Sequence, residues 1–285
     1  MELKKRVDFM VLLEAINSNP NGNPDSGNMP RQDIDSGRGI ITDVCIKRKI
    51  RDYIDAIKDG QDGYDIYIKS GEALNAKDNS AITEISKDKG SEINGWDVID
   101  FMCQKYYDIR TFGAVMTGLQ KAKGLSVNGA IKGPVQFSFG QSVDPIMPQE
   151  ITITRKAVAT EEEKKTHEHT MGNKYIVPYG LYVFEGHISA EHAAKTGFSE
   201  EDMDLLFDAL LNTWDRDVSA ARGHMAVRKI IKFEHNNLHG SCPSYRLFDM
   251  VHIKKKDDVS VPRCFRDYDI TIDKDIPNGV TVTEI

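Results

Sequence analysis

The sequence has few cysteines and no long apolar run. Its four cysteines, Cys45, Cys103, Cys242 and Cys264, are widely spaced and form no C-x-x-C pair, so neither a disulfide framework nor a thiolate zinc site is indicated. No stretch approaches the roughly 18 uninterrupted apolar residues of a membrane-spanning helix. The basic start is followed by no small-residue cleavage site, so a signal peptide is not expected. We therefore predict a cytoplasmic protein with free thiols and no membrane partner.

Most motifs of common enzymes are also missing. There is no G-x-S-x-G, no P-loop, no dinucleotide fingerprint and no H-E-x-x-H. His167 and His169 form H-x-H, but they lie in a polar stretch with no cysteine or third histidine nearby, whereas a zinc site needs a full ligand set. His235 and His239 are interpreted in the same way, as solvated side chains. We predict no catalytic residue, no metal and no cofactor.

The chain also lacks an excess of positive charge. It carries 37 Lys and Arg against 44 Asp and Glu, a formal net charge of −7, which by itself argues weakly against nucleic-acid binding. Binding depends on the local field, however. The segment VCIKRKIR at 44–51 contains only positive charges. One basic face on an acidic body is therefore compatible with the composition.

The apolar periodicity predicts an α+β protein. Strands are expected within 7–16, 64–70, 127–142, 151–159, 175–189 and 219–235, with further strands in the tail, and helices over 42–60, 95–110 and 198–214. Residues 71–93 are polar and are interpreted as a mobile insertion. No repeat or Pro-rich linker divides the chain, so residues 1–285 should form one elaborated domain. A strand–helix–strand opening followed by helix–strand units suits a ferredoxin-like core with insertions.

Local signals define the ends and faces of these helices. Thr42 or Asp43 should cap the first helix, and Ser199 with Asp202 three residues on is close to a capping box. In the helix over 95–110, Trp96 is among the side chains expected to face inward. Two strands around the charged stretch EEEKKTHEH predict a projecting hairpin.

A long loop, NSNPNGNPDSGNMPRQD at 17–33, precedes the first helix. Loops that only connect two elements need about 4–6 residues. A loop of this length, rich in Asn, Pro and Gly, therefore suggests a surface with a function. Lys47, Arg48 and Arg51 lie outside the apolar stripe of the helix and should face solvent. A solvated face is the simpler interpretation. The alternative is binding to phosphate and sugar by backbone N–H groups, amides and basic side chains.

Several long stretches resemble a known family. They are NPNGNPDSGNMPRQDIDSGRGIITDVCIKRKIRDYI, DIRTFGAVM, GAIKGPVQFSF, ITRKAVATEEE, TMGNKYIVPYGLYVFEGHISA, TGFSEEDMDLLFDALLNTW and SAARGHMAVRKIIKF. They run in order over most of the chain and resemble the backbone subunit of the type I-C CRISPR-associated complex, the Cas-seven (Csd-two) family.

The resemblance implies a fold and a function. It implies a modified RRM palm, a finger region inserted at 60–95 and a β-hairpin thumb at 150–178. Such a subunit is not a nuclease; copies of it polymerise along the spacer of a CRISPR RNA and present the guide for pairing with target DNA in antiviral defence. The implied partners are CRISPR RNA, the target DNA strand, further copies of the chain, a guide-processing Cas-five-type subunit, and large and small subunits of the Cascade complex.

The resemblance and the basic pattern together give a set of expected RNA contacts. These are Asn17, Asn19, Arg31, Lys47, Arg48, Arg51, Arg110, Lys132, Arg155, Met171 and Arg222. Met171 is included as an apolar wedge that displaces a base at the thumb; packing inward is its other interpretation. The sheet lacks the RNP aromatic signature of a common RRM, so backbone binding with weak sequence preference is expected.

Two other functions remain open at this stage. One is an endoribonuclease on an RRM-like scaffold that cuts the CRISPR repeat with a histidine or lysine as base. The other is a structural assembly protein without nucleic acid. The loop over 17–33 also has two possible roles, since its lack of charge before Arg31 suits contact with a neighbouring copy as well as contact with RNA.

Overall fold

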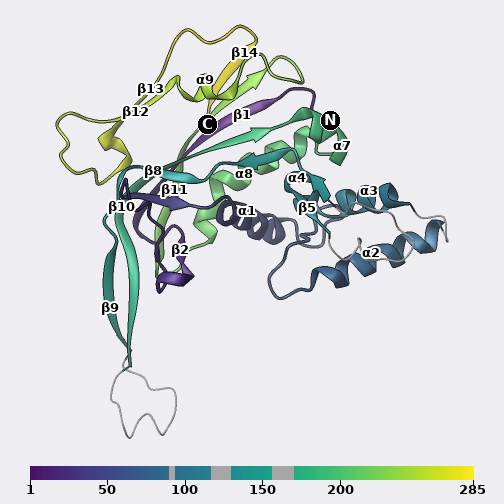
Figure 1. The fold of residues 1–285 in the computed structure, drawn as a ribbon, viewed down its shortest axis with the longest axis horizontal. Coiled ribbons are helices and arrows are strands. Elements are labelled where there is room, and N and C mark those ends of the chain that lie inside the picture. Colours follow the sequence, from purple (N-terminus) through teal and green to yellow (C-terminus); the bar gives the residue numbers. More distant parts are fainter. Residues whose placement is uncertain (90–93, 117–129, 156–169) are drawn as a thin grey trace, which may run out of the picture.

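The computed structural model describes residues 1–89, 94–116, 130–155 and 170–285, and its centre is an eight-stranded sheet (Figure 1). The strand order is β14-β11-β1-β10-β8-β4, and β7 and β9 also pair with β10. The bounds are β1 (Val7–Ser18), β4 (Arg38–Ile41), β7 (Val135–Phe137), β8 (Gly140–Pro145), β9 (Gln149–Arg155), β10 (Thr170–Ile188), β11 (Arg222–His235) and β14 (Val280–Glu284).

Strand β1 lies in the middle of this sheet. It pairs antiparallel with β10 on one side, Val7 opposite Ile188, and with β11 on the other, Val7 opposite Glu234. Its apolar residues are buried on both faces of the sheet, because both faces are covered. The predicted strand over 7–16 is confirmed.

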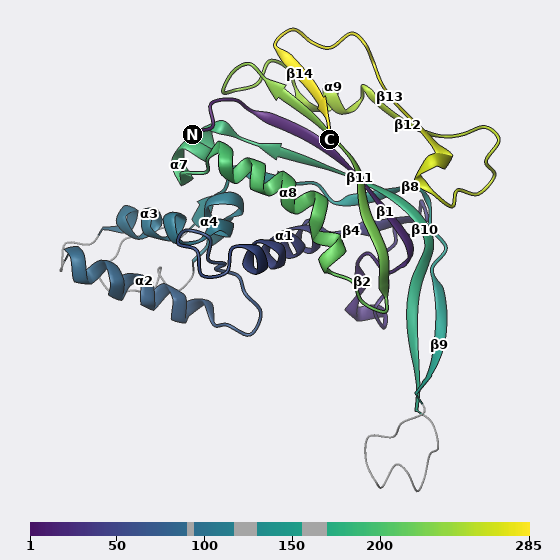
Figure 2. The same cartoon turned by 180° about the vertical axis from the view of Figure 1, so that it is seen from behind.

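Helices α1 (Asp43–Ile57) and α8 (Glu200–Arg216) cover one face of the sheet (Figure 2). Phe9, Val11 and Leu13 of β1 belong to one buried cluster with the inner faces of these helices. Both predicted caps are present. Thr42 Oγ1 accepts from Cys45 N at 3.3 Å, and Ser199 with Asp202 forms a complete capping box.

The C-terminal segment covers the other face. It contains α9 (Ser244–Phe248), β12 (Val251–Lys255), the short 3-10 turn η2 (Phe265–Asp267) and β13 (Tyr268–Ile272), the yellow part of Figure 1. Met10 and Leu12 of β1 pack in a separate buried cluster with Leu247 and Phe248. The further strands predicted in the tail are confirmed.

A helical lobe extends from one end of the sheet. It comprises α2 (Leu74–Lys89), α3 (Gly95–Lys105), α4 (Tyr107–Phe112), β5 (Gly113–Val115) and β6 (Ala130–Lys132). It has its own buried cluster, which includes Ala81, Ile85 and Met102. Among the helices of the described residues, none is long and apolar enough to cross a membrane.

Several predictions for this lobe are wrong. The stretch 74–89 is a helix rather than a mobile insertion, and 64–70 forms turns with a single bridge from Asp65 to Tyr106. That bridge interrupts the predicted helix over 95–110, which splits into α3 and α4 at Tyr106. Trp96 is 73% exposed instead of buried. The finger boundary at 60–95 stays a prediction.

The predicted hairpin projects from the sheet (Figure 1). β9 pairs with the first part of β10, from Arg155 opposite Thr170 to Gln149 opposite Ile176. The rest of β10 is a central strand beside β1. One continuous strand thus connects the hairpin to the core. The charged stretch with His167 and His169 lies outside the described residues.

Candidate nucleic-acid interface

Asparagine side chains order the long loop before α1. The loop contains β2 (Gly22–Asn23), the 3-10 turn η1 (Pro24–Ser26) and β3 (Met29–Pro30). Asn19 Nδ2 donates to Asn28 O at 2.7 Å, and Asn21 Oδ1 accepts from Thr42 N at 3.0 Å. Asn28 has φ 66°, a left-handed conformation that asparagine tolerates. The loop is therefore folded onto the start of α1.

The same loop is bound to the start of β11. Asn19 N donates to Ala221 O at 2.6 Å, and His224 N donates to Ser18 Oγ at 3.1 Å. These bonds place Arg222 beside the first residues of the loop, to which Arg31 is joined by a bond from Arg31 N to Asn21 O at 3.0 Å. Three segments distant in sequence therefore meet at the first turns of α1.

Charged side chains gather there around Cys45. Lys49 forms an ion pair with Asp217, and Arg222 Nε lies 2.6 Å from Asp217 Oδ2. Burial raises the pKa of the Cys45 thiol, against the opposing fields of Lys49, Arg222 and Arg31. We call Arg31, Lys49, Asp217 and Arg222 the Cys45 cluster. It holds three cations and one carboxylate, an excess of positive charge on an acidic chain.

Buried polar atoms at this site lack a hydrogen-bond partner within the part of the chain that the structure describes. Within the described ranges, no carboxylate pairs with Arg31, whose buried Nε makes no hydrogen bond, and Asn19 Oδ1 is likewise buried without a donor. Unpaired buried polar atoms are rare because each costs on the order of 1–3 kcal/mol. A guanidinium without an internal carboxylate is available to an external anion, and phosphate suits its geometry.

The cluster shares one side of the molecule with the hairpin. The loop with β2 lies beside the base of β9 and β10 in both views (Figures 1 and 2). A Cβ at Gly27 would lie 3.9 Å from Tyr175 Cε2 of β10. The surface therefore combines a basic cluster, exposed amides such as Asn17, and a projecting hairpin.

Three predicted contact residues do not lie on the solvent side. Arg51 is 8% exposed and its Nε lies 2.8 Å from Asp108 Oδ2. Lys47 is 14% exposed and binds Asp43 and Gln136, both at 3.1 Å. The prediction that Lys47 and Arg51 face solvent is therefore wrong, because both are held by these polar partners and lie over the ring of Phe112.

Arg110 is the third. Its Nε and Nη2 donate to the two carboxylate oxygens of Asp202 at 3.0 and 2.8 Å. Its guanidinium also packs over Tyr64 and Tyr107. A bidentate pair buried between rings links α4 to the start of α8 and leaves little of Arg110 for a ligand.

The remaining predicted RNA-contact residues are spread over several elements. Arg48 is exposed but pairs with Asp52 one turn on. Lys132 is exposed on β6, in the helical lobe. Arg155 and Met171 have backbones in the hairpin, near its outer described end, and their side chains lie outside the description. The structure thus brings together Asn19, Arg31 and Arg222.

Sequence reasoning missed Lys49 and Asp217. Lys49 belongs to the same KRKIR segment, but it lies between the apolar stripe and the outer face of α1. Asp217 follows α8 and meets Lys49 only in the folded chain, 168 residues apart in sequence. Only Lys49 had a local signal, its place in the basic run.

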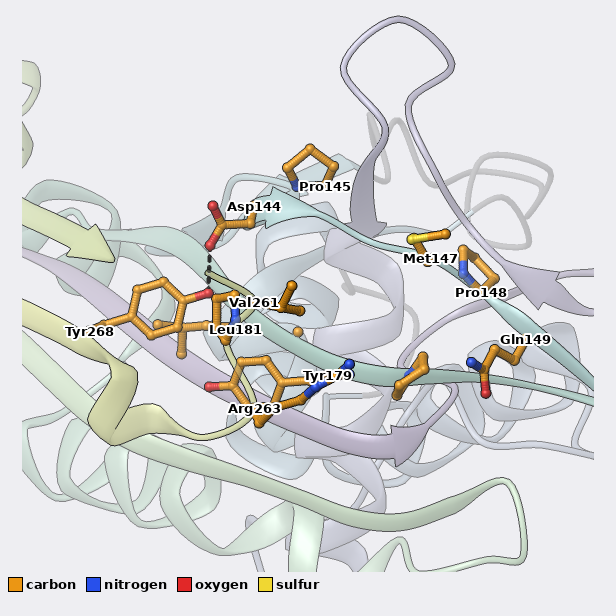
Figure 3. Close-up of a pocket in the computed structure, with 13 residues that line it drawn as sticks. Asp144, Pro145, Met147, Pro148, Gln149, Tyr179, Leu181, Val261, Arg263 and Tyr268 are labelled. Carbon is orange, nitrogen blue, oxygen red and sulfur yellow. Dashed lines mark hydrogen bonds between the residues drawn. The ribbon is translucent and has the colours of Figure 1, made fainter. Parts of the chain in front are cut away.

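A cavity of about 230 Å³ lies elsewhere, beside the base of the hairpin (Figure 3). Tyr268 of the C-terminal segment donates to Asp144 Oδ2 of β8 at 2.6 Å, the dashed line in Figure 3. Burial, strengthened by this acceptor, raises the pKa of Tyr268. This bond ties the C-terminal segment to the sheet, which is a structural role.

A buried carboxylate, Asp8, orients two histidines. His235 Nδ1 accepts from Ser241 N at 2.8 Å, so its Nε2 donates to Asp8 Oδ2 at 2.8 Å. His187 Nδ1 lies 2.7 Å from Asp8 Oδ1, and its side chain is 40% exposed. His187 is therefore an oriented imidazole that reaches solvent. Among the described residues, no group of three or more His, Cys, Asp or Glu could hold a metal ion.

Comparison with known proteins identifies the family. Residues 5–273 match the profile of the family described as CRISPR-associated protein Cas7. The chain belongs to the CRISPR-associated protein Cas7 family. A Cas7 protein of Haloferax volcanii is 28% identical over 258 residues, which cover 84% of this chain and 74% of that protein.

Comparison with solved structures also finds similar chains. A chain of a CRISPR RNA-guided surveillance complex in a pre-nicking state is similar with a TM-score of 0.49 and 12% identity, over 80% of this chain and 78% of that chain. A chain of the type III-B Cmr-beta complex bound to cognate target RNA has a TM-score of 0.42 and 14% identity, over 79% and 60% of the two chains.

Proposed function

We propose that this Cas7 protein is a non-catalytic backbone subunit that binds CRISPR RNA in a type I-C Cascade surveillance complex. Copies polymerise along the guide spacer and hold it for pairing with the target DNA strand in antiviral defence. The observation that carries the proposal is the Cys45 cluster, where no carboxylate of the described residues pairs with Arg31 and where the loop that carries Arg31 contacts β10.

The proposed mode of binding is contact with phosphate and sugar. Arg31 and Arg222, which are both partly exposed, supply charge-assisted donors to phosphate. Such contacts hold the strand without reading its sequence. Sequence is then read by base pairing, as in other RNA-guided systems.

The strand order supports the proposed palm. The four central strands lie in the order β11-β1-β10-β8, and α1 and α8 cover one face, which is the arrangement of a ferredoxin-like β-α-β-β-α-β unit. The hairpin of β9 and β10 is the proposed thumb. Arg155 and Met171 near its outer end are proposed to reach the guide, and the helical lobe is the proposed finger region.

Partners follow from the polymerisation. Further copies of the chain, a guide-processing Cas-five-type subunit, and the large and small Cascade subunits are proposed to share its surface. The family resemblance and the excess acidic charge away from the Cys45 cluster support contacts of this kind. The loop over 17–33 carries Arg31 of the cluster, contacts β10 and is proposed to contact the guide.

The experiment is expression of the chain with and without a CRISPR array. The proposal expects guide-length RNA to copurify only with the array, in assemblies larger than one chain. Filaments that form without RNA, with a protein-only absorbance ratio, would instead support a structural assembly protein.

A second assay separates the endoribonuclease alternative. Pure protein is incubated with repeat RNA in EDTA, and the proposal expects no defined cleavage. Because His187 is oriented by Asp8 and reaches solvent, His187→Ala is the variant to compare. Cleavage at one position that His187→Ala abolishes would replace the proposal with the enzyme.

A further inference from the structure

A second cavity, of about 580 Å³, opens in the helical lobe. Its walls come from the start of α3, from β6 and from the short helix α7 (Ala190–Thr196). The helical lobe extends from the sheet on the side away from the hairpin (Figure 1). The cavity is therefore separate from the Cys45 cluster.

Trp96 forms one wall of this cavity and is 73% exposed. It follows Asn94, whose side chain accepts from the backbone N–H groups of Trp96 and Asp97 and so fixes the start of α3. The other tryptophan, Trp214, is 3% exposed. An exposed indole on a capped helix offers an aromatic face for stacking, beside the apolar side chains of Ile99 and Ile131.

The polar side chains of the cavity are basic or neutral. Lys132, Lys195 and His192 line it, and the described lining residues include no carboxylate. Two acidic residues next in sequence to lining residues are engaged with other groups: Asp97 Oδ2 accepts from Asn94 N at 3.0 Å, and Glu191 Oε1 lies 2.9 Å from His239 Nδ1. Although the chain has a net charge of −7, the side chains that line this cavity favour an anionic ligand.

His192 adds a polar group that can form a hydrogen bond with a nucleobase. Its Nδ1 is buried without a hydrogen-bond partner. Burial lowers the pKa of His192, and the fields of Lys132 and Lys195 lower it further. The lowered pKa favours the neutral imidazole, and Nε2 is the ring nitrogen that remains for a ligand because Nδ1 is buried.

We propose that this cavity binds one unpaired nucleotide of a single-stranded nucleic acid, with the base stacked on Trp96 and the phosphate between Lys132 and Lys195. Stacking on an aromatic side chain combined with cations along the backbone is the common mode of single-strand binding. The site tolerates any base, because each has a flat face. It is additional to the proposed guide site and does not depend on it.

Tryptophan fluorescence tests the proposal, with hexamers of dT and rU as separate titrants. Both should quench the emission of Trp96, and a difference in affinity between them identifies the preferred sugar. Trp96→Phe should remove the part of the quenching that comes from Trp96 while retaining most of the binding. Trp96→Ala should weaken binding measured by a labelled hexamer about tenfold.

Three further variants test the specificity of the result. Hexamer binding by the Arg31→Ala variant measures any contribution of the Cys45 cluster. Quenching of the Trp96 emission should persist in this variant. Lys132→Ala with Lys195→Ala should lose quenching, whereas the exposed pair Lys254→Ala with Lys274→Ala should not. Quenching unchanged in Trp96→Phe, or absent with both hexamers in the wild-type chain, would overturn the proposal.

Discussion

Arg51 Nε lies 2.8 Å from Asp108 Oδ2, with the two side chains 8% and 1% exposed. Asp108 also accepts from the backbone N–H groups of Tyr67 and Ile68 at 2.7 and 3.0 Å. The pair therefore links α1 to the segment that enters the helical lobe. A residue of the basic run KRKIR is thus part of the interior, and the basic surface lies beside it.

Removal of this arginine should damage stability. We predict that Arg51→Ala lowers the free energy of unfolding by about 3–5 kcal/mol, because it leaves Asp108 as a buried charge without its partner. Arg48→Ala removes the same charge from the same helix, but its pair with Asp52 is exposed, so the loss should stay below about 1 kcal/mol. Urea unfolding measures both. Equal losses would contradict the assigned burial.

A glycine in the central strand allows a close contact. A Cβ at Gly186 would lie 2.1 Å from the Phe9 ring in the core. We predict that Gly186→Ala destabilises the protein by about 1–3 kcal/mol, the usual effect of overpacking. Gly172 is on the same strand with nothing within 4 Å, so Gly172→Ala is the matched control. Thermal unfolding should show a lower Tm only for Gly186→Ala.

The buried Asp8 predicts a pH dependence of stability. Burial acts to raise its pKa, but hydrogen bonds from His187 and His235 and the charge of Arg6 outweigh burial and hold the pKa below the usual value. A lowered pKa gives stability that is present above the unfolded pKa of about 4 and lost as the pH falls through the folded pKa.

The variant Asp8→Asn tests this sign. Its deficit in unfolding free energy relative to the wild-type chain should be largest near pH 6–7 and should shrink below about pH 4. Urea unfolding at a series of pH values measures the difference. A deficit that grows as the pH falls would contradict the assignment.

Much of the fold could be predicted because its signals are local. The apolar run of β1, the Thr42 cap and the capping box at Ser199 each depend on residues that are close together in sequence. Helix α2 was missed because its sequence is mostly polar. Its inward side chains Ala81 and Ile85 are one turn apart, a weak signal beside many charges.

The candidate site was less predictable because it depends on distant contacts. The partners of Arg51 and Arg110 lie 57 and 92 residues away in sequence. Spacing on a helix shows that an arginine leaves the apolar stripe, but it does not show that a carboxylate from another element meets it. Asn19, Arg31 and Arg222 came together because the loop is bound to the start of β11.

The salt dependence of RNA binding by Arg31→Ala tests the central claim most directly. Affinity for single-stranded RNA should fall with salt in the wild-type chain, and Arg31→Ala should bind more weakly with a log–log slope reduced by about 0.7 per lost phosphate contact. Lys254→Ala removes an exposed charge of the same sign elsewhere and should keep the wild-type slope. Identical affinity and slope in Arg31→Ala and the wild-type chain would contradict the assignment of the Cys45 cluster as the RNA interface.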